Sequence, residues 1–253
     1  MSSKILFQGK GNIATITLNN PAKLNALDKD MIKELDDTLE KIRKSNIRVV
    51  IIKGAGTSFC SGGDILWERK LCDINAEIAK KEMKFLQDVF AKIEELPQIF
   101  IAFMHGHVAG GGNELAMACD IRVAVDTVKI SQPENTLGTV PAVGGTKRLA
   151  RLIGIGKAKY MLFTGNIIDG KTALQWGLTD FLVFEKQVKT FLDSLASSIA
   201  EKPKKALELT KKSISENCHS ELKDEFELNS YIECSRSKEN KAMFDKFLNR
   251  KKN

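Results

Sequence analysis

The sequence predicts an α/β fold of layered strands and helices, followed by a helical C-terminal segment. Three observations support this prediction: short apolar runs typical of buried strands, amphipathic helical repeats between them, and the loss of strand patterns after about Lys186. Strands that alternate with helices are typical of layered α/β domains. At 253 residues, 43% of them hydrophobic, the chain is long enough to bury a sizeable core.

The first elements follow from local patterns. Residues 13–18 alternate strand-forming residues after a glycine-rich turn signal at 9–12, which predicts a hairpin. Residues 25–43 repeat apolar side chains at helical spacing, and Asp28 stands where an N-cap is expected. Residues 48–53 form an apolar run, which is typical of a strand covered on both faces.

The middle of the chain continues this alternation. A long helical pattern follows and is expected to stop at Pro97, which cannot continue a helix. Its apolar positions are Ile78, Phe85, Val89, Ile93 and Leu96. Residues 99–104 and 121–125 are predicted strands. Between them, a glycine break at 110–112 precedes a short predicted helix over 113–119, and the end of the chain is predicted to be all helical.

Composition narrows the class of partner. A net charge of +7 and a pI of about 9.1 predict attraction for anions: nucleic acid, a membrane surface or a phosphorylated small molecule. Most basic residues stand beside acidic ones, as at 80–82 and 223–225, which is typical of solvated helix faces. No apolar run reaches the length of a membrane span, and the first ten residues lack a secretion-signal pattern. We therefore expect a cytoplasmic protein without a membrane partner.

Cysteine and histidine residues offer little chemistry. The five cysteines contain no CxxC pair and are expected to be reduced, structural thiols; they are Cys60, Cys72, Cys119, Cys218 and Cys234. A nucleophilic pair of Cys60 and His105 is an alternative, although a buried thiol in an apolar loop is typically inert. His105 and His107 lack further ligands at metal-site spacing, so no metal site is predicted.

Two glycine-rich segments and two glutamates point to catalysis. Small residues at 61–63 and 110–112 let a ligand approach the backbone and leave N–H groups free to point at it. The second segment opens a helix, whose N-terminus favours an oxygen that gains negative charge. Glu114 begins an apolar helix and Glu134 follows Pro133, so the two carboxyls could divide acid and base roles in one cleft.

Each of these features also has a purely structural interpretation. The glycine clusters could be tight turns, Glu114 could complement a helix dipole, and Glu134 could be a surface loop residue. These alternatives stay open at the level of residue patterns. The sequence lacks a phosphate-binding loop, a serine nucleophile elbow and a complete dinucleotide fingerprint.

Taken in order, four segments make the chain resemble the crotonase superfamily, and within it the enoyl-CoA hydratase/isomerase family. The resemblance covers residues 13–184, with a weaker, compositional likeness in the helical tail. The segments are Asn19-Asn20-Pro21 with Leu24-Asn25-Ala26-Leu27, Ser61-Gly62-Gly63-Asp64-Ile65, Gly110-Gly111-Gly112-Asn113-Glu114-Leu115-Ala116, and Pro141 with Gly144-Gly145-Thr146-Lys147-Arg148-Leu149.

The resemblance implies a crotonase-like spiral of β-β-α repeats over residues 1–190 and a helical trimerisation region over residues 191–253. It implies a homotrimer, or a homohexamer built from two trimers. The partner would be an acyl-CoA substrate that itself carries the coenzyme A, so no separate cofactor, no metal and no nucleic acid are expected.

The same resemblance assigns roles to residues. The backbone N–H groups of Gly63 and Gly111 would form an oxyanion hole, and Glu114 and Glu134 would be the catalytic pair. The coenzyme A moiety would contact Ala22, Lys23, Leu24, Ser61, Asp64, Ile65 and, near the C-terminus, Lys246.

Several positions depart from the family pattern. Gly63 stands where hydratases commonly have alanine, a change expected to be minor because the N–H is kept. Lys23 falls one place later than usual, which puts its adenine contact in doubt. Asn135 and the pair at 142–143 are expected to polarise or narrow the acyl pocket.

The implied reaction is hydration of 2-enoyl-CoA thioesters to 3-hydroxyacyl-CoA, a lyase reaction of fatty acid metabolism such as β-oxidation. Glu114 would deprotonate a water that attacks Cβ, and Glu134 would protonate Cα. Double-bond isomerisation is the nearest alternative, and one carboxylate can perform it, so two glutamates favour hydration. A non-catalytic RNA- or partner-binding homologue is an alternative of another class, which no aromatic-rich basic stripe supports.

Overall fold

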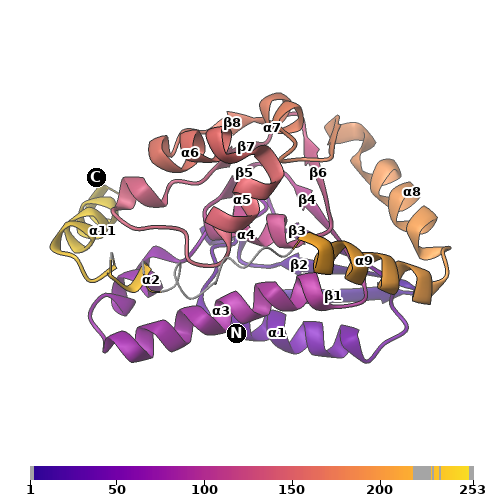
Figure 1. The fold of residues 1–253 in the computed structure, drawn as a ribbon, viewed down its shortest axis with the longest axis horizontal. Coiled ribbons are helices and arrows are strands. Elements are labelled where there is room, and N and C mark those ends of the chain that lie inside the picture. The colour runs from indigo at the N-terminus through magenta and orange to yellow at the C-terminus, as the bar shows by residue number, and fades with distance from the viewer. Residues whose placement is uncertain (1–2, 219–228, 230, 234, 251–253) are drawn as a thin grey trace.

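The computed structural model describes residues 3–218, 229, 231–233 and 235–250 (Figure 1). A six-stranded sheet forms its centre, in the order β1-β2-β3-β4-β6-β9. These strands are β1 (Ile5–Lys10), β2 (Ile13–Leu18), β3 (Val49–Gly54), β4 (Ile99–Met104), β6 (Ile121–Val125) and β9 (Phe181–Val183). The predicted strands are confirmed in type and position.

The sheet begins with the predicted hairpin. β1 and β2 pair antiparallel, with Ile5 opposite Leu18, and Gly11 adopts a φ of +61° in the turn between them. All other neighbours in this sheet are parallel. Parallel strands are typically covered on both faces, which explains why β3 and β4 are almost continuously apolar.

A second, three-stranded sheet is formed by β5 (His107–Ala109), β7 (Lys129–Ser131) and β8 (Ile168–Asp169). The chain alternates between the two sheets: β4 is followed by β5 and helix α4 (Gly111–Ala118), and β6 by β7 and helix α5 (Gly145–Ile153). The first strand of each unit joins the large sheet and the second joins the small one. These two units show the strand-strand-helix order that the sequence predicts.

The other helical elements complete the layers. They are η1 (Pro21–Lys23), α1 (Lys29–Arg43), α2 (Ile65–Leu71), α3 (Ala76–Glu95), η2 (Glu134–Leu137), α6 (Ile155–Thr164), α7 (Gly170–Trp176), η3 (Glu185–Gln187), α8 (Val188–Ala200), α9 (Lys204–Cys218) and α11 (Lys238–Arg250). Among the residues that the structure describes, no helix is both long enough and apolar enough to span a bilayer.

Helices α1 and α3 pack beside each other and bury one face each in the main core. Asp28 caps α1 as predicted, because its side chain accepts a hydrogen bond from the amide of Met31 at 3.0 Å. The predicted apolar face of α3 is wrong in part: Ile78 is 52% exposed and Phe85 37% exposed. The buried stripe runs instead along Ala79, Met83, Leu86, Val89, Phe90 and Ile93. Ala79 and Leu86 thus take the inward positions that the sequence pattern assigned to Ile78 and Phe85.

Helix α8 covers the opposite face of the large sheet. Its residues Leu192, Ala196 and Ala200 form a second apolar cluster with side chains of β3, β4, β6 and β9. The expected boundary between residues 190 and 191 falls inside this helix. The division into two parts remains a prediction.

The C-terminal helices lie at different ends of the molecule. α9 lies beside α8 in Figure 1, whereas α11 lies at the other end of the view, next to α2. The Lys211 ammonium of α9 donates to the carbonyls of Ile93 and Gln98 and to the carboxylate of Asp120, each at 2.9 Å. On α11, Asn240 is fully buried and donates to the carbonyl of Leu137 at 2.7 Å. The end of the described chain therefore folds back over its own α/β core.

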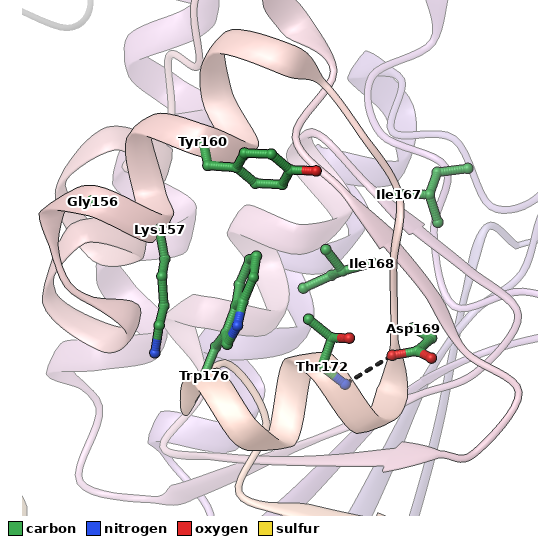
Figure 2. Close-up of a pocket in the computed structure, with 8 residues that line it drawn as sticks. All are labelled: Gly156, Lys157, Tyr160, Ile167, Ile168, Asp169, Thr172 and Trp176. Carbon is green, nitrogen blue, oxygen red and sulfur yellow. Dashed lines mark hydrogen bonds between the residues drawn. The ribbon is translucent and has the colours of Figure 1, made fainter.

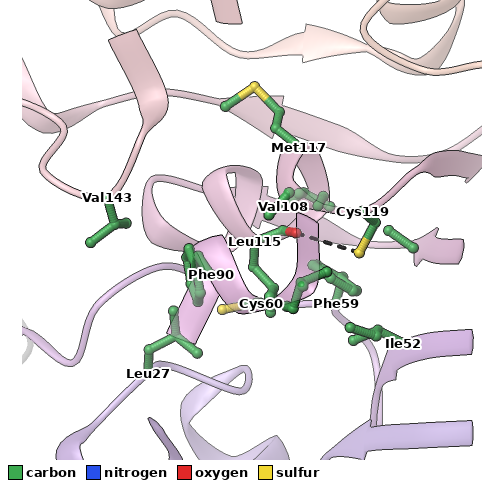
Figure 3. Close-up of a cluster of buried hydrophobic side chains, with 14 of the residues drawn as sticks. Leu27, Ile52, Phe59, Cys60, Phe90, Val108, Leu115, Met117, Cys119 and Val143 are labelled. Carbon is green, nitrogen blue, oxygen red and sulfur yellow. Dashed lines mark hydrogen bonds between the residues drawn. The ribbon is translucent and has the colours of Figure 1, made fainter. Parts of the chain in front are cut away.

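Helix α4 runs through the middle of the main core. Its residues from Gly112 to Ala118 are all buried, and Figure 3 shows Leu115, Phe59 and Phe90 close together in this cluster. Apart from Asn113 and Glu114 this helix is apolar, which suits a position inside the core. Cys60, Cys72 and Cys119 are free and buried, as predicted, whereas the side chain of Cys218 and all of Cys234 lie outside the described residues.

Candidate active site

Glu114 projects from the first turn of α4 and is 2% exposed. Its Oε1 atom accepts hydrogen bonds from the backbone amides of Val143, at 3.0 Å, and Gly145, at 2.7 Å. Gly145 is the first residue of α5, so the carboxyl lies at the positive end of a second helix. Backbone amides move little, and they therefore hold this carboxyl in one orientation.

Glu134 begins the short helix η2 and is positioned by a chain of buried amides. The Asn113 side chain donates to Gln132 Oε1 at 2.7 Å, and Gln132 Nε2 donates to Glu134 Oε1 at 2.8 Å. Asn113 and Gln132 are both fully buried. Gly110, at a φ of +50°, lets the carboxyl approach, because a Cβ there would lie 3.1 Å from Glu134 Oε1.

The amides of Gly63 and Gly111 face the same space. A Cβ built on Gly111 would lie 3.6 Å from the Gly63 nitrogen and 3.9 Å from Glu114 Oε2. Neither amide donates a hydrogen bond to any residue that the structure describes. Gly111 is the first residue of α4, where amides have no partner within the helix. The two N–H groups can therefore serve a ligand oxygen.

All four predicted groups line one small pocket. Its volume is about 30 Å³, and it is lined by Leu27, Gly63, Glu68, Met83, Leu86, Gly111, Glu114, Glu134, Thr139, Val140, Ala142, Val143 and Tyr231. The structure thus brings together both glutamates and the two glycines whose amides were predicted to form an oxyanion hole. Ala142 and Val143 line the pocket, as expected from the sequence. Asn135 is exposed and does not line it, so the expectation that this residue polarises the pocket is not supported.

Three polar residues of this pocket were missed by the sequence analysis: Glu68, Thr139 and Tyr231. Burial, followed by the nearby charges of Glu134 and Asp64, raises the pKa of Glu68 to about 8. The Glu68 carboxyl lies against Gly63, since a Cβ on that glycine would come within 1.8 Å of Glu68 Oε1. With glycine at position 63, the Glu68 carboxyl occupies the space that the Cβ of an alanine would fill.

The residues expected to contact coenzyme A adjoin one another in the segments 22–24 and 61–65, the second of which contains Gly63. The amide of Ser61 donates to the Leu24 carbonyl at 3.0 Å, and the Ser61 hydroxyl donates to the Lys23 carbonyl at 3.2 Å. The Lys23 ammonium pairs with Asp64, whose other oxygen caps α2 by accepting from the amides of Leu66 and Trp67. Asp64 is therefore used within the fold, where it sets the direction of α2.

Ala22 lies in η1 with Lys23, and Ile65 is the first residue of α2. Lys246 is exposed on α11, and its side chain forms no hydrogen bond or ion pair with the residues that the structure describes. Hydrogen bonds, an ion pair and chain neighbours connect the first six predicted residues, whereas Lys246 lies on a separate element, α11, that packs against α2.

The alternative pair of Cys60 and His105 is not assembled. Cys60 contacts the backbone of Gly62, and His105 Nε2 lies 3.2 Å from the carbonyl oxygen of Gly54. Burial raises the pKa of the Cys60 thiol to about 12, which keeps it protonated and unreactive.

A larger hollow lies at the surface between α6, β8 and α7, with a volume of about 570 Å³ (Figure 2). The Lys157 ammonium lies 5.8 Å from the centre of the Trp176 ring, and Tyr160 contacts that ring edge-on. The carboxylate in the lining of this hollow is Asp169, which caps α7 by accepting a hydrogen bond from the amide of Thr172 at 2.8 Å. The lining of this hollow includes no second carboxylate that could divide acid and base roles with Asp169.

Comparison with known proteins agrees with this geometry. The sequence model of the family described as enoyl-CoA hydratase/isomerase matches residues 8–253. The short-chain-enoyl-CoA hydratase of Clostridium acetobutylicum is 33% identical over 99% of this chain and 96% of its own length. The crotonyl-CoA hydratase of Syntrophomonas wolfei is 32% identical over 98% of this chain and 96% of its own.

Solved structures agree as well. The crystal structure of an enoyl-CoA hydratase from Bacillus anthracis superimposes with a TM-score of 0.81 at 30% identity, covering 98% of this chain and 96% of that one. An enoyl-CoA hydratase from Bacillus halodurans reaches 0.89 at 21% identity, covering 96% and 100%, which shows the common fold. A family match over nearly the whole length, together with relatives above 30% identity, leads to one conclusion: this chain belongs to the enoyl-CoA hydratase/isomerase family.

Proposed function

We propose that this protein hydrates 2-enoyl-CoA thioesters to 3-hydroxyacyl-CoA. The observation that carries the proposal is a single pocket lined by two glutamates and by two glycines whose amides have no partner among the described residues. Hydration needs a base for water, an acid for carbon and a site for the oxygen that becomes negative. This pocket contains a group for each of these needs.

In the proposed mechanism, the amides of Gly63 and Gly111 bind the thioester oxygen. Glu114 removes a proton from a water molecule, whose oxygen bonds to Cβ while the Cα–Cβ double bond becomes an enolate. Glu134 then gives a proton to Cα, which restores the carbonyl, and the two carboxyls finally exchange one proton through solvent. Each oxyanion donor contributes about 2.7 to 4 kcal/mol to a transition state of this kind.

A short acyl group fits this site best. The pocket measures about 30 Å³ and its lining includes the large side chains of Met83, Leu86 and Tyr231, so a long chain would have to displace several side chains. The relatives named as short-chain-enoyl-CoA hydratase and crotonyl-CoA hydratase support the same substrate size. We propose that the nucleotide end of the thioester lies along 22–24 and 61–65, with Lys246 near its phosphates.

We also propose that the protein is a homotrimer or a homohexamer in the cytoplasm. Large apolar side chains are exposed on and around α6, where Phe163 is 70%, Ile155 66% and Ile167 60% exposed. An exposed apolar patch of this kind is typical of a subunit interface. The free thiols fit a reducing compartment. Light scattering after size-exclusion chromatography measures the subunit number.

The test of the activity is hydration of crotonyl-CoA, followed by the loss of ultraviolet absorbance of its conjugated double bond. The expected result is turnover by the wild type and severe loss in both Glu114→Gln and Glu134→Gln. Incubation with a 3-enoyl-CoA distinguishes an isomerase, which would instead generate that absorbance. Near-native hydration by both glutamine variants would overturn the assignment.

A further inference from the structure

The pocket contains polar side chains that hydration of a plain enoyl chain does not use. Glu68, Thr139 and Tyr231 line it together with the apolar side chains of Met83 and Leu86. They come from α2, from the turn after η2 and from the C-terminal segment, and so three separate parts of the chain converge here.

The Glu68 side chain bends back over the start of its own helix, α2, until its carboxyl contacts Gly63. It forms no hydrogen bond or ion pair with any residue within the described part of the chain. The charged or titratable groups that act on it are Glu134 and Asp64, and it acts in turn on Tyr231 and Cys72. Because its pKa is raised to about 8, this carboxyl is largely protonated at neutral pH and can donate a hydrogen bond.

Two buried hydroxyls complete this polar group. Tyr231 is 2% exposed and Thr139 is 4% exposed, yet neither hydroxyl has a hydrogen-bond partner in the part of the chain that the structure describes. Buried polar atoms are nearly always paired in folded proteins, and exceptions call for a functional explanation. Both residues line the pocket, so a polar group bound there can supply the partner that the described residues do not.

We propose that Glu68, Tyr231 and Thr139 form a polar subsite that selects an acyl chain bearing a neutral hydrogen-bonding group, such as a hydroxyl, over a chain of the same size that ends in a methyl group. This inference rests on the proposed function and specifies its substrate class. The three side chains offer both donors and acceptors, which a hydroxyl can match. An apolar chain would leave them buried and unpaired, which is strongly unfavourable.

The charges of the pocket define which polar group fits. Three carboxyl side chains, Glu68, Glu114 and Glu134, line it, and its described lining includes no lysine, arginine or histidine. A carboxylate on the acyl chain would find no cationic partner in this lining and would face the carboxyl groups that remain ionised, which disfavours its binding. A neutral group avoids this cost.

The test compares two esters of equal size, trans-4-hydroxycrotonyl-CoA and trans-2-pentenoyl-CoA, which differ by a hydroxyl in place of a methyl group. The expected result is a kcat/KM at least about tenfold higher for the hydroxylated ester, because pockets built to bind a hydroxyl reject analogues that lack it. Tyr231→Phe and Glu68→Met are expected to reduce this ratio to about one or below. Thr139→Val should reduce it by a smaller factor.

Two controls keep the result interpretable. Leu86→Met alters the same pocket without changing a polar group and should keep the ratio. Hydration of crotonyl-CoA, which lacks the substituent, is measured in parallel for every variant, so that a general loss of activity is separated from a loss of selectivity. Titration calorimetry of both esters against Glu114→Gln measures the same preference as a ratio of Kd values, independently of turnover.

The polar subsite would be overturned if pentenoyl-CoA were bound and hydrated as well as or better than the hydroxylated ester, and if Glu68→Met and Tyr231→Phe left the ratio of the two esters unchanged. The proposed hydration activity would still stand in that case. If no ester is hydrated by the wild type, the proposed function fails, and the calorimetric ratio still decides whether the subsite exists.

Discussion

Two hollows in the described part of this protein, the surface hollow beside α6 and the buried pocket with Glu114 and Glu134, differ in size and in chemistry. The surface hollow of about 570 Å³ is nearly twenty times larger than the buried pocket of about 30 Å³. Yet the large hollow has one carboxylate, Asp169, which is used to cap its own helix. The small pocket has two glutamates held by buried donors and two amides without partners among the described residues. The predicted catalytic groups therefore line the smaller of these two hollows.

The difference follows from how each hollow is built. The walls of the surface hollow come from α6, β8 and α7, which are consecutive in the chain. The buried pocket is lined from Leu27 to Tyr231, so its geometry depends on the packing of the entire core. Catalytic groups require such fixed placement, because small displacements reduce rates strongly. The following substitutions test whether chemistry is confined to the small pocket.

The largest effect is expected for Glu114→Gln and Glu134→Gln. Each should lower kcat by about 10²- to 10⁴-fold, because a positioned acid or base typically contributes that factor. KM should change little, since neither change removes the oxyanion amides. Steady-state hydration of crotonyl-CoA measures both constants. Glu201→Gln, at an exposed position after α8, is the matched control and should be unaffected.

An intermediate effect is expected for Gln132→Leu. This change removes the hydrogen bond to Glu134 and leaves Asn113 without its acceptor. The expected loss in kcat is about tenfold or more, because a hydrogen bond to a charged group contributes about 1.5 to 3 kcal/mol. Gln98→Leu removes a similarly buried glutamine that donates to the Ile42 carbonyl far from the pocket. Equal losses in the two variants would show that the first acts only through stability.

A smaller effect is expected on the pH dependence of stability. The pKa of Glu68 rises from 4.5 to about 8 on folding, in a site that faces Glu134, Asp64, Tyr231 and Cys72. Between these values the folded protein keeps a proton that the unfolded chain loses, so the free energy of unfolding contributed by Glu68 falls as the pH rises through this window. Glu68→Gln should remove that fall.

Urea denaturation at pH 5, 6.5 and 8 checks this expectation. The variant should gain stability relative to the wild type as the pH increases, and Glu201→Gln should not. Parallel profiles for Glu68→Gln and the wild type would mean that the Glu68 carboxyl is solvated rather than held within the pocket.

The smallest effect is expected in the surface hollow. Lys157→Gln removes the charge beside Trp176, and both hydration and stability should stay within about twofold of the wild type, as is usual for surface substitutions. A loss of activity comparable to that of Glu134→Gln would contradict the proposal that the chemistry is confined to the buried pocket, because it would place a functional group in the surface hollow.

Much of the fold could be predicted from the sequence because it is specified by local patterns. Alternating strand residues, the cap at Asp28 and the stop at Pro97 act over a few positions, and each appears in the structure as expected. The inward face of α3 was predicted only in part, because Ile78 and Phe85 match a helical repeat as well as Leu86 does. Only contact with α1 and α4 decides which stripe is buried.

Some residues of the candidate site could likewise be predicted from the sequence, whereas others could not. Glu114 and Glu134 stand next to glycine-rich or proline-containing turns and could be singled out from the sequence. Glu68 and Tyr231 could not, because a glutamate in a charged helix and a tyrosine in a helical tail are ordinary in sequence. Glu68 reaches the pocket because its side chain turns from α2 toward Gly63, and Tyr231 reaches it because the end of the chain folds back over the core.

The sequence by itself thus determined the type and order of most elements, the family and the two glutamates, since these depend on residue identity and short spacings. The tertiary structure alone decided which amides are left without partners among the described residues, which of two hollows holds the carboxyls, and that a third carboxyl joins them. Such properties arise where segments distant in the chain exclude water together, and burial of that kind is a property of the packed molecule rather than of any one segment.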